Sequence, residues 1–332
     1  MAPVNPPSNS PSTAFSPDTR FLVTGGAGFI GSNLVDHLIE SGYATRVLDN
    51  FSTGKEENLT HHHQNPLFEL VRGDLRSPDD CARACQGIDY VLHQGALGSV
   101  PRSVSDPRTT NDVNVGGTLN IFLAARDAKV RRVVYASSSS VYGDEPNLPK
   151  VEHRLGKVLS PYALTKLTDE IYGELFYSLY GLQTVGLRYF NVFGKRQDPH
   201  SVYAAVIPIF VKSLMSGNAP SIFGDGGQTR DFTYINNVIE ANLLSALAPE
   251  TACGRAYNIS FGENTSLLVL YDKLCTLLNR HVSPVFAPDR PGDIRHSLAD
   301  ISLAREHLGY NPKFSIDDGL ARTIEWYVKH LG

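Results

Sequence analysis

The sequence predicts an α/β protein in which a doubly wound parallel sheet is joined to a smaller, mixed α/β domain. Three observations favour this fold class. Short apolar segments alternate with amphipathic helical segments from Arg20 to about residue 190. A glycine-rich turn links the first apolar segment to the first helical one. After Asn191 the alternation becomes irregular, and loops rich in Gly and Pro separate the helices. Strands that alternate with helices are typical of a parallel sheet.

Length and composition agree with a globular protein of two domains. The chain has 332 residues, of which 42% are hydrophobic and 19% charged, and a domain usually contains about 100–200 residues. The net charge is −4 and no block of Lys and Arg occurs, which argues against a nucleic acid or an anionic membrane as partner. No apolar run approaches the length of a membrane span.

The N-terminal segment and the cysteines indicate a cytoplasmic protein. Residues 1–18 are rich in Pro and Ser and lack the basic start and apolar core of a signal peptide, so we expect a disordered tail. The triplet His61–His63 has no acid or Cys at ligand spacing beside it, and we interpret it as a surface loop rather than a metal site. The four cysteines are expected to be reduced and mostly buried; they are Cys81, Cys85, Cys253 and Cys275.

The first domain is predicted to span residues 19–190, with a later return of the chain near residues 231–260. Between Arg20 and Asp49 the sequence indicates a strand, the glycine turn, a helix and a second strand. Further strands are expected in residues 67–75, from residue 88, and in residues 131–139 and 182–194, with helices near residues 78–86, 107–128 and 161–180. The second domain is predicted to comprise residues 191–230 and 261–332, and later helices are expected near residues 203–217, 236–247, 265–279 and 316–330.

The glycine-rich turn predicts a dinucleotide site. Gly25, Gly26, Gly28 and Gly31 lie between a strand and a helix, where glycine permits a tight turn, close approach of a pyrophosphate and close packing of helix on strand. The phosphates then lie at the helix N-terminus, which favours negative charge. Asp49 ends the next strand, where a carboxylate binds the ribose hydroxyls and repels a 2′-phosphate. The sequence therefore predicts NAD rather than NADP.

A second group of residues predicts acid–base chemistry. Tyr162 and Lys166 are four residues apart in a helical segment, so their side chains point to the same side. A tyrosine becomes a usable base when its phenolate is stabilised, which a nearby ammonium does. The segment from Tyr135 to Gly143 reads YASSSSVYG, and a serine at the end of this strand can hold a substrate oxygen within reach of the tyrosine.

The glycine turn, the strand-end serine and the Tyr–Lys pair, in this order, resemble the extended short-chain dehydrogenase/reductase family of nucleotide-sugar enzymes, over nearly the whole chain from about Arg20. The resemblance implies a Rossmann-type first domain and a UDP-sugar-binding second domain. It implies that Ser138, Tyr162 and Lys166 are catalytic. The residues that it implies for contacts with NAD are Gly25, Gly28, Phe29, Ile30, Gly31, Asp49, Asn50, Ser52, Gly54, Asp74, Leu75, Gln94, Ala96, Asn114, Tyr162 and Lys166. A turn explains Asp74 equally well.

The residues around the serines distinguish the reactions of this family. The 4,6-dehydratases carry an Asp-Glu pair after the hydroxyl residue, and the UDP-glucuronate decarboxylases carry a Glu at the second of these positions. Ser139 and Ser140 stand there in this chain, so elimination of water lacks its general acid and base. The pattern is that of the epimerases, which oxidise and re-reduce one carbon, and it assigns the catalytic hydroxyl to Ser138. Ser139 and Ser140 are expected to be packing residues or secondary contacts to the substrate.

Three segments of the second domain resemble the substrate-binding loops of the family. LRYFNVFG supplies Asn191 for the diphosphate, and GDGGQTRDF supplies Arg230 for a phosphate. DRPGDIRH supplies Arg290 for a phosphate and Asp293 for the uridine ribose. Two arginines on separate loops suit a diphosphate, because charge-assisted hydrogen bonds are strong.

The match is closest to the UDP-hexose 4-epimerases that act on N-acetylated sugars. The segment Leu97–Ser103 follows this subgroup, with Gly98 where the UDP-galactose branch has a Lys, and Gly98 and Ser99 are implied to contact the substrate. Gly95 departs from the usual Ala of the subgroup. The resemblance also concerns Ser297. Enzymes restricted to UDP-glucose and UDP-galactose have a bulky Tyr at the position that matches it. A small side chain there leaves room for a 2-N-acetyl group.

The sequence therefore predicts an NAD-dependent 4-epimerase that interconverts UDP-N-acetylglucosamine and UDP-N-acetylgalactosamine. Two alternatives stay open: a UDP-glucuronate 4-epimerase, in which Arg102 would bind the sugar carboxylate, and a UDP-glucose/UDP-galactose 4-epimerase. A non-catalytic protein that binds NAD or a sugar nucleotide is disfavoured by the intact set of Ser, Tyr and Lys. The family also implies a homodimer formed by the helices near residues 107–128 and 161–180.

Overall fold

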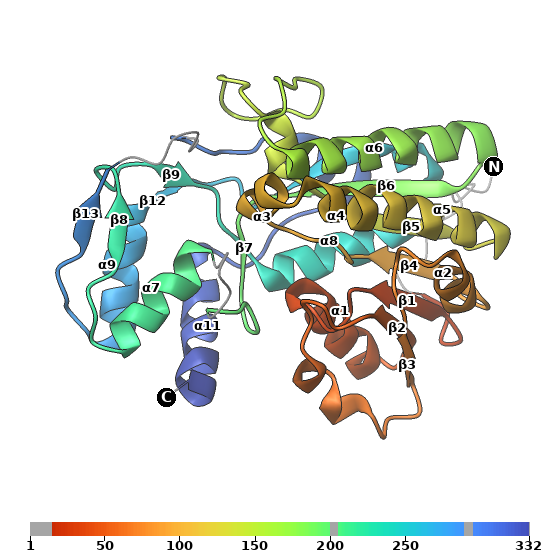
Figure 1. Ribbon diagram of the computed structural model, residues 1–332, viewed down its shortest axis with the longest axis horizontal. Helices are drawn as coiled ribbons and strands as arrows, with labels where there is room; N and C mark the ends of the chain where they lie inside the picture. Colours follow the sequence, from red (N-terminus) through yellow and green to blue (C-terminus); the bar gives the residue numbers. More distant parts are fainter. Residues whose placement is uncertain (1–14, 200–204, 289–294, 332) are drawn as a thin grey trace, which may run out of the picture.

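The computed structural model describes residues 15–199, 205–288 and 295–331 of the chain. Its core is a sheet of seven parallel strands in the order β3-β2-β1-β4-β5-β6-β11 (Figure 1). The strands are β1 (Arg20–Thr24), β2 (Ala44–Asp49), β3 (Phe68–Arg72), β4 (Tyr90–His93), β5 (Arg132–Ser138), β6 (Gln183–Tyr189) and β11 (Arg255–Ile259). This arrangement confirms the predicted doubly wound α/β fold.

The order of the strands reverses between β1 and β4. The chain proceeds from β1 to β3 on one side and then returns to continue from β4 on the other. In doubly wound sheets, ligands bind beyond the carboxyl ends of the strands at such a reversal. Thr24 and His93 end these two strands opposite each other. The segments that follow them, the glycine turn and Gln94–Gly98, both line one cavity at this edge.

Helices cover both faces of the sheet, as the alternation of β1 side chains shows. Phe21 and Val23 belong to one apolar core and Leu22 to the other, because successive side chains of a strand point to opposite faces. On the first face α1 (Phe29–Glu40) packs against α8 (Ile235–Leu247). On the other, α5 (Gly117–Asp127) packs against both α2 (Pro78–Cys85) and α6 (Pro161–Tyr180).

Besides the large sheet, the structure contains small two-stranded sheets and a group of three packed helices. β7 (Val192–Phe193) pairs with β10 (Thr233–Tyr234), β9 (Thr229–Arg230) with β12 (Thr265–Ser266), and β8 (Ser221–Phe223) with β13 (Val285–Ala287). α9 (Leu267–Leu278) packs against α7 (Val206–Met215) and α11 (Ile316–Leu331), and these helices lie to the left of the large sheet in Figure 1. The division into two domains at the residues given above stays a prediction.

The helical prediction for residues 107–128 is confirmed, but the helix is not regular throughout. The structure divides this segment into α4 (Pro107–Asn111), a π-helical turn (Asp112–Gly116) and α5. The sequence also gave no indication of α3 (Val100–Ser105) or α10 (Ser302–Leu308), because helices this short display too few turns for a clear apolar period.

The predicted boundary of the N-terminal tail is also wrong. Phe15 packs edge-on against Phe21, with their ring centroids 4.9 Å apart, and against Tyr43 and Tyr90. Because this aromatic contact anchors the chain at the edge of the first core, residues 15–18 belong to the folded protein. Residues 1–14 lie outside the described part.

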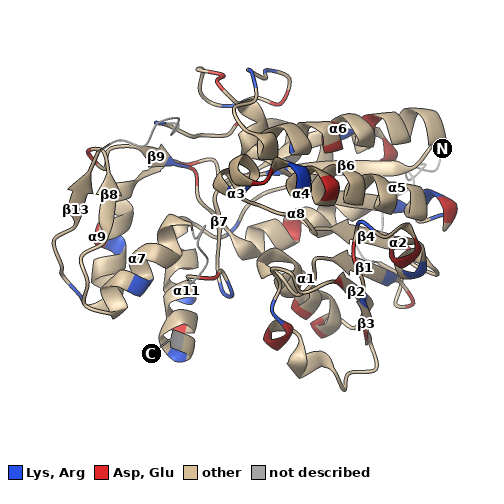
Figure 2. Cartoon of the chain, in the orientation of Figure 1, with Lys and Arg blue, Asp and Glu red and all other residues tan. Residues whose placement is uncertain are grey.

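The distribution of charged side chains and the state of the cysteines agree with what the composition indicates. Positive and negative side chains are interspersed along the chain (Figure 2). All four cysteines are free and buried, as expected. Within the described ranges, none of the helices has the length and apolar character that crossing a membrane requires.

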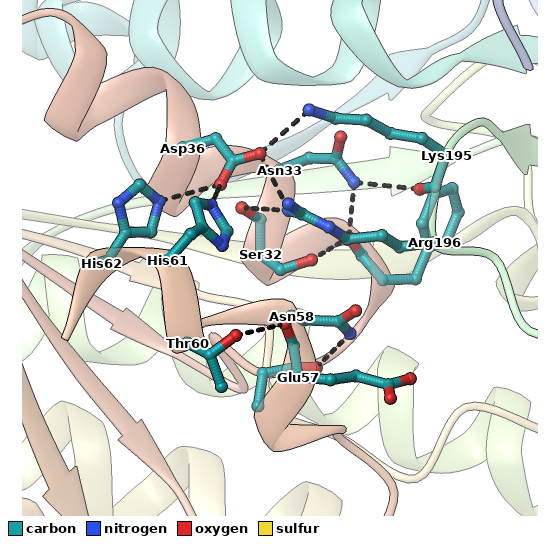
Figure 3. Close-up of polar contacts among 12 residues, drawn as sticks. Ser32, Asn33, Asp36, Glu57, Asn58, Thr60, His61, His62, Lys195 and Arg196 are labelled. Atoms are coloured by element: carbon teal, nitrogen blue, oxygen red, sulfur yellow. Dashed lines mark hydrogen bonds and ion pairs between the residues drawn. The ribbon is translucent and has the colours of Figure 1, made fainter. Parts of the chain in front are cut away.

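The histidine triplet is not simply a surface loop. His62 is buried, and Nε2 of both His61 and His62 lies 2.9 Å from Oδ1 of Asp36 on α1. The other oxygen of Asp36 pairs with Lys195 and Arg196, each at 2.9 Å. Figure 3 shows the carboxylate between the two groups. The sequence prediction missed this contact because α1 and the triplet are separated by strand β2.

Three potential metal-ligating atoms, from Asp36, His61 and His62, lie within 4.8 Å of one another. The ammonium of Lys195 and the guanidinium of Arg196 repel a metal ion at this position, because both contact the same carboxylate. We therefore interpret the group as an ionic and hydrogen-bonded contact. It connects α1 to the segment that follows β7.

We predict that Asp36 makes the folded protein sensitive to acid. Burial alone would raise the pKa of Asp36, but Arg196, Lys195 and His62 outweigh it and lower the pKa from 3.8 to about 2. The carboxylate therefore stabilises the folded state above about pH 4, and this contribution is lost as the pH falls towards 2. Burial lowers the pKa of His62. The folded protein therefore also loses stability as the pH falls below 6.5, the ordinary pKa of a histidine.

Asp36→Asn is expected to lower the free energy of unfolding at pH 7 by about 2 kcal/mol. Guanidinium titrations at pH 7 and pH 3 measure it, and the difference between variant and unaltered protein should shrink at pH 3. The control Asp317→Asn removes a carboxylate that is 64% exposed and paired with Lys273, and little change is expected. Equal effects of the two substitutions would contradict the prediction.

Candidate active site

A cavity of about 430 Å³ lies beyond the carboxyl ends of β1, β2 and β4. It brings together most of the residues that the sequence predicted for NAD. Its lining includes Gly25, Gly28, Phe29, Ile30, Gly31, Asp49, Asn50, Ser52, Gly54, Asp74, Leu75, Gln94 and Ala96. Asn114, Tyr162 and Lys166 are not among its lining residues. The individual contacts of all these residues with NAD stay predictions.

The glycine turn has the close approach that a dinucleotide site requires. A Cβ at Gly31 would lie 2.1 Å from the carbonyl oxygen of Gly25, and Gly25 itself has a φ of +65°, which L side chains rarely adopt. No side chain caps the N-terminus of α1 at Gly28. The first amide groups of α1 are therefore available to a negatively charged group, as the pyrophosphate of NAD would be. The turn fits this cofactor.

Asp49 both braces the turn and faces the cavity. Its Oδ2 accepts a hydrogen bond from the backbone N–H of Ala27 at 2.9 Å, and its Oδ1 accepts one from Phe51 at 2.8 Å. Burial raises the pKa of Asp49. Because a carboxylate can accept about four hydrogen bonds, and the backbone of Asn50 also interacts with Asp49, acceptor capacity remains for a ribose hydroxyl.

Two neighbouring positions explain details of the lining. Asp74 accepts hydrogen bonds from Arg76 and from Nδ2 of Asn50, and these contacts keep its pKa below the ordinary value. Asp74 is thus a charged residue at the cavity and also part of a turn. A Cβ on Gly95 would lie 2.7 Å from Cδ1 of Leu75. The leucine therefore occupies the space that the usual Ala would need.

Asn114 lies in the π-helical turn and holds two parts of the site together. Its Oδ1 accepts from the backbone N–H of Leu97 at 2.8 Å, and its Nδ2 donates to Oγ1 of Thr165 at 3.0 Å. A π-turn displaces the helix locally and frequently occurs at functional sites. Here it joins the segment after β4 to α6, directly beside Lys166.

The serines at the end of β5 have different contacts. Ser138 accepts from the backbone N–H of Ser140 at 3.1 Å and caps the 3-10 turn Ser139–Tyr142. Ser137 instead donates to the carboxylate of Glu170 on α6. Helix α6 packs against both β5 and the 3-10 turn, so the helix that carries Tyr162 and Lys166 lies against the strand that ends in Ser138.

A buried network fixes α6 to the sheet. The guanidinium of Arg188 on β6 donates to both oxygens of Glu170, at 2.8 and 2.7 Å, and to the hydroxyl of Tyr142 at 3.0 Å. Tyr142 in turn donates to Oδ1 of Asn258 on β11 at 2.6 Å. These bonds connect the ends of β5, β6 and β11 to the middle of α6.

Lys166 has a charged partner that the sequence reasoning missed. Its Nζ donates to Oδ2 of Asp169 at 3.0 Å, and the two side chains are 3% and 1% exposed. The spacing of three residues on a helix is a signal that could have indicated the contact. The lysine predicted to assist Tyr162 is therefore half of a buried ion pair.

A second cavity of about 630 Å³ lies beside the first. Asn191 and Arg230, which the sequence predicted for the diphosphate, line it together with apolar side chains such as Phe193 and Phe210. Gln197 lines both cavities, and its Oε1 is buried without a hydrogen-bond partner among the described residues. An elongated ligand with a polar centre, such as a nucleotide sugar, suits adjoining cavities of this kind.

The structure describes only some of the remaining residues that were predicted to contact the substrate. Gly98 lines the first cavity, and Ser99 caps α3 by accepting from the N–H of Arg102. Ser297 is half-buried and donates its N–H to the carbonyl of Thr229 at 3.1 Å, but it is not among the lining residues of either cavity. Arg290 and Asp293 lie outside the described residues.

The structure adds lining residues that the sequence did not suggest. The segment Arg196–Asp198 returns after β7 and lines one side of the first cavity, as does Lys55. Arg102, which the sequence suggested only for a sugar carboxylate, lines the same cavity. Arg196 has a φ of +69° and is held by Asp36 and by the carbonyl of Ser32. Only the three-dimensional arrangement places this segment beside the glycine turn, since about 160 residues separate them.

The chain is similar to proteins of known family and structure. Residues 21–260 match the NAD dependent epimerase/dehydratase family. A UDP-glucose 4-epimerase of Mycolicibacterium smegmatis is 39% identical over 310 residues, which are 93% of this chain and 98% of that protein. A UDP-glucose 4-epimerase structure from Thermotoga maritima, with UDP-glucose, has a TM-score of 0.89 and 36% identity, covering 95% of this chain and 100% of the other.

A structure of UDP-N-acetylglucosamine 4-epimerase from Methanobrevibacter ruminantium M1, in complex with UDP-N-acetylmuramic acid, also has a TM-score of 0.89. Its identity is 38%, and the match covers 94% of this chain and 99% of the other. The predicted relationship to NAD-dependent nucleotide-sugar enzymes is thereby confirmed at the level of the family. The chain belongs to the NAD-dependent epimerase/dehydratase family.

Proposed function

We propose that this protein is an NAD-dependent nucleotide-sugar 4-epimerase that interconverts UDP-N-acetylglucosamine and UDP-N-acetylgalactosamine. The proposal rests on the packing of α6, which carries Tyr162 and Lys166, against the end of β5, where Ser138 lies. In addition, Ser139 and Ser140 stand at the positions where a dehydratase has acidic residues. We place the activity in the cytoplasm, as suits a chain whose four cysteines are free.

In this proposal Tyr162, as phenolate, takes the proton from the 4-hydroxyl of the sugar, and Ser138 holds the same oxygen by a hydrogen bond. Lys166 stabilises the phenolate by its charge. NAD, held by the residues that line the first cavity, would supply the hydride acceptor for C4 and then the hydride donor, and it would not be consumed. Asn191 and Arg230 retain the diphosphate while the 4-keto sugar turns over. Tyr162 then gives the proton back to the oxygen.

Two other substrates remain as alternatives, and one observation supports each of them. Arg102 lines the first cavity beside Gly98, which supports a sugar with a carboxylate, as in UDP-glucuronate. The similarity to UDP-glucose 4-epimerases supports a sugar without the acetyl group. The small residue Ser297 favours the N-acetylated sugars, because a bulky side chain at that position would exclude the acetyl group.

We predict that the purified protein converts UDP-N-acetylgalactosamine without added cofactor, because NAD stays bound between turnovers. Tyr162→Phe is expected to lower kcat by about 10³-fold, because it removes the base but keeps the ring. Product formation is measured by anion-exchange chromatography, with UDP-galactose and UDP-glucuronate in parallel. Full activity of the variant would exclude the proposed mechanism, and turnover of UDP-glucuronate alone would favour the carboxylate-bearing substrate.

Ser297→Tyr is predicted to act on substrate choice. We expect kcat/KM for UDP-N-acetylgalactosamine to fall by roughly two orders of magnitude and that for UDP-galactose to change little, because only the acetyl group needs the space. Ser297→Ala keeps the space and serves as the matched control. A parallel loss for both sugars in the tyrosine variant would show that position 297 does not select the acetyl group.

We also propose that the protein forms a homodimer through α6, as the family implies, with α3 in place of the predicted helix near residues 107–128. Leu164, Ile171, Leu175 and Leu179 are all exposed on α6, the last at 67%, and their spacing places them on one face of the helix. The neighbouring α3, which packs against α6, exposes Val100 and Val104. An apolar face of this kind suits a second copy of the chain, because a two-fold contact buries the same surface twice.

The double substitution Ile171→Glu and Leu179→Glu is expected to convert a dimer into a monomer, because it buries two like charges at the contact. Light scattering coupled to gel filtration measures the mass. Val328→Glu changes an apolar residue that is 51% exposed on α11 and is the matched control. A monomer already formed by the unaltered protein would disprove the dimer.

A further inference from the structure

The buried pair of Lys166 and Asp169 is more than a structural ion pair, because one oxygen of the carboxylate is left over. Oδ2 accepts the hydrogen bond from Lys166, whereas the buried Oδ1 makes no well-formed hydrogen bond among the described residues, and Thr118 adds only a weaker interaction with the carboxylate. An incompletely solvated carboxylate inside a protein is costly. Its retention beside the lysine of a Tyr–Lys pair points to a role in the reaction.

A chain of buried hydrogen bonds leads from the glycine turn towards Asp169. The N–H of Gly95 donates to Oγ1 of Thr24 at 3.1 Å, and this hydroxyl lies 2.6 Å from Nδ1 of His93. Nε2 of His93 lies 3.0 Å from Oγ1 of Thr118. The hydroxyl of Thr118 interacts with Asp169 and lowers its pKa.

The carboxylate of Asp169 sets the direction of these hydrogen bonds, because a carboxylate can only accept. Thr118 therefore offers its hydrogen to Asp169 and accepts from Nε2–H of His93. In this tautomer of the neutral ring, Nδ1 of His93 accepts from the hydroxyl of Thr24. Burial and the charge of Lys166 lower the pKa of His93 to about 3, so the ring is neutral. The chain therefore favours Asp169 as a carboxylate.

We propose that Asp169 is a positioning residue that fixes the ammonium of Lys166 and, as its counter-ion, limits how strongly that ammonium stabilises the phenolate of Tyr162. The inference rests on the proposed function, in which Tyr162 is the base. An epimerase takes a proton from the 4-oxygen and returns a proton to it. A base of this kind works best when neither of its two forms is strongly favoured. An uncompensated ammonium in a buried site would favour the phenolate too strongly.

Three other titratable groups face the pair. Glu170 on α6 is paired with Arg188, His93 on β4 is neutral because its pKa is lowered to about 3, and burial raises the pKa of Tyr135 on β5 well above 10. Burial raises the pKa of Asp169 to about 6. Asp169 therefore acts as a counter-ion above about pH 6 and loses this effect below it.

The test is Asp169→Asn, which keeps an oxygen that accepts from Lys166 but removes the charge. The pH dependence of kcat and of kcat/KM is measured with UDP-N-acetylgalactosamine from pH 5 to pH 9, together with the NAD content and the melting temperature. We expect the acid limb of the profile to move to lower pH by about one unit. The two profiles should converge below about pH 6, where Asp169 itself is protonated.

Glu174→Gln removes the same charge from an exposed position of α6 and should leave the profile unshifted. A profile of Asp169→Asn that is lower at every pH but not shifted would overturn the proposal, since a purely structural role has that result. If this variant does not fold, Thr118→Val replaces it. Loss of the Thr118 hydroxyl raises the pKa of Asp169, so that Asp169 is less often charged at a given pH. We expect the acid limb of the profile to move in the same direction as in Asp169→Asn, but by less. An unchanged profile would overturn the proposal.

The outcome is distinguishable from a failure of the proposed function. If Tyr162→Phe is inactive and Asp169→Asn has an unshifted profile, only the counter-ion role of Asp169 is wrong. If Tyr162→Phe keeps full activity, Tyr162 is not the base, and both the proposed mechanism and the role of Asp169 in it are excluded.

Discussion

The ion pair between Arg188 and Glu170 is the interaction on which the catalytic edge depends. Both side chains are nearly buried, and the guanidinium contacts the carboxylate through two parallel hydrogen bonds, a geometry that restricts orientation as well as distance. Loss of either partner would leave an isolated charge inside the protein, at a cost of about 3–5 kcal/mol. Because the same carboxylate accepts from Ser137, the pair fixes α6 relative to the end of β5.

This arrangement explains how four consecutive serines acquire different tasks. Ser137 is used to join β5 to α6, and Ser138 begins a 3-10 turn whose Tyr142 contributes to the same network. The turn directs the chain away from the sheet immediately after Ser138. The hydroxyl of Ser138 is therefore at the last position of the strand, beside the helix that carries Tyr162. A polar run that weakens a strand is tolerated here because the hydroxyls of Ser137, Ser138 and Ser140 have defined partners.

The sequence was sufficient to predict the fold and most of the residues that line the first cavity, and the reason is local. The strand, glycine turn and helix from Arg20 are contiguous, and glycine is required there for reasons that a short segment already displays. Asp49 follows at a fixed distance for the same reason. The contacts of Asp36 with Lys195, and of Lys166 with Asp169, were not predicted. The first depends on a loop far away in the sequence, and the second on burial, which residue spacing alone does not reveal.

The loop after β7 connects these features to the handling of the cofactor. Arg196 and Gln197 line one side of the first cavity, although they follow β7 and lie far from the glycine turn in the sequence. Asp36 on α1 holds Lys195 and Arg196 by ion pairs. The cavity is thus bounded by a segment that is tied by ion pairs to the helix that follows the glycine turn. Such a fixed segment suits an epimerase, because the hydride taken from the sugar must return to the same sugar before NAD can leave.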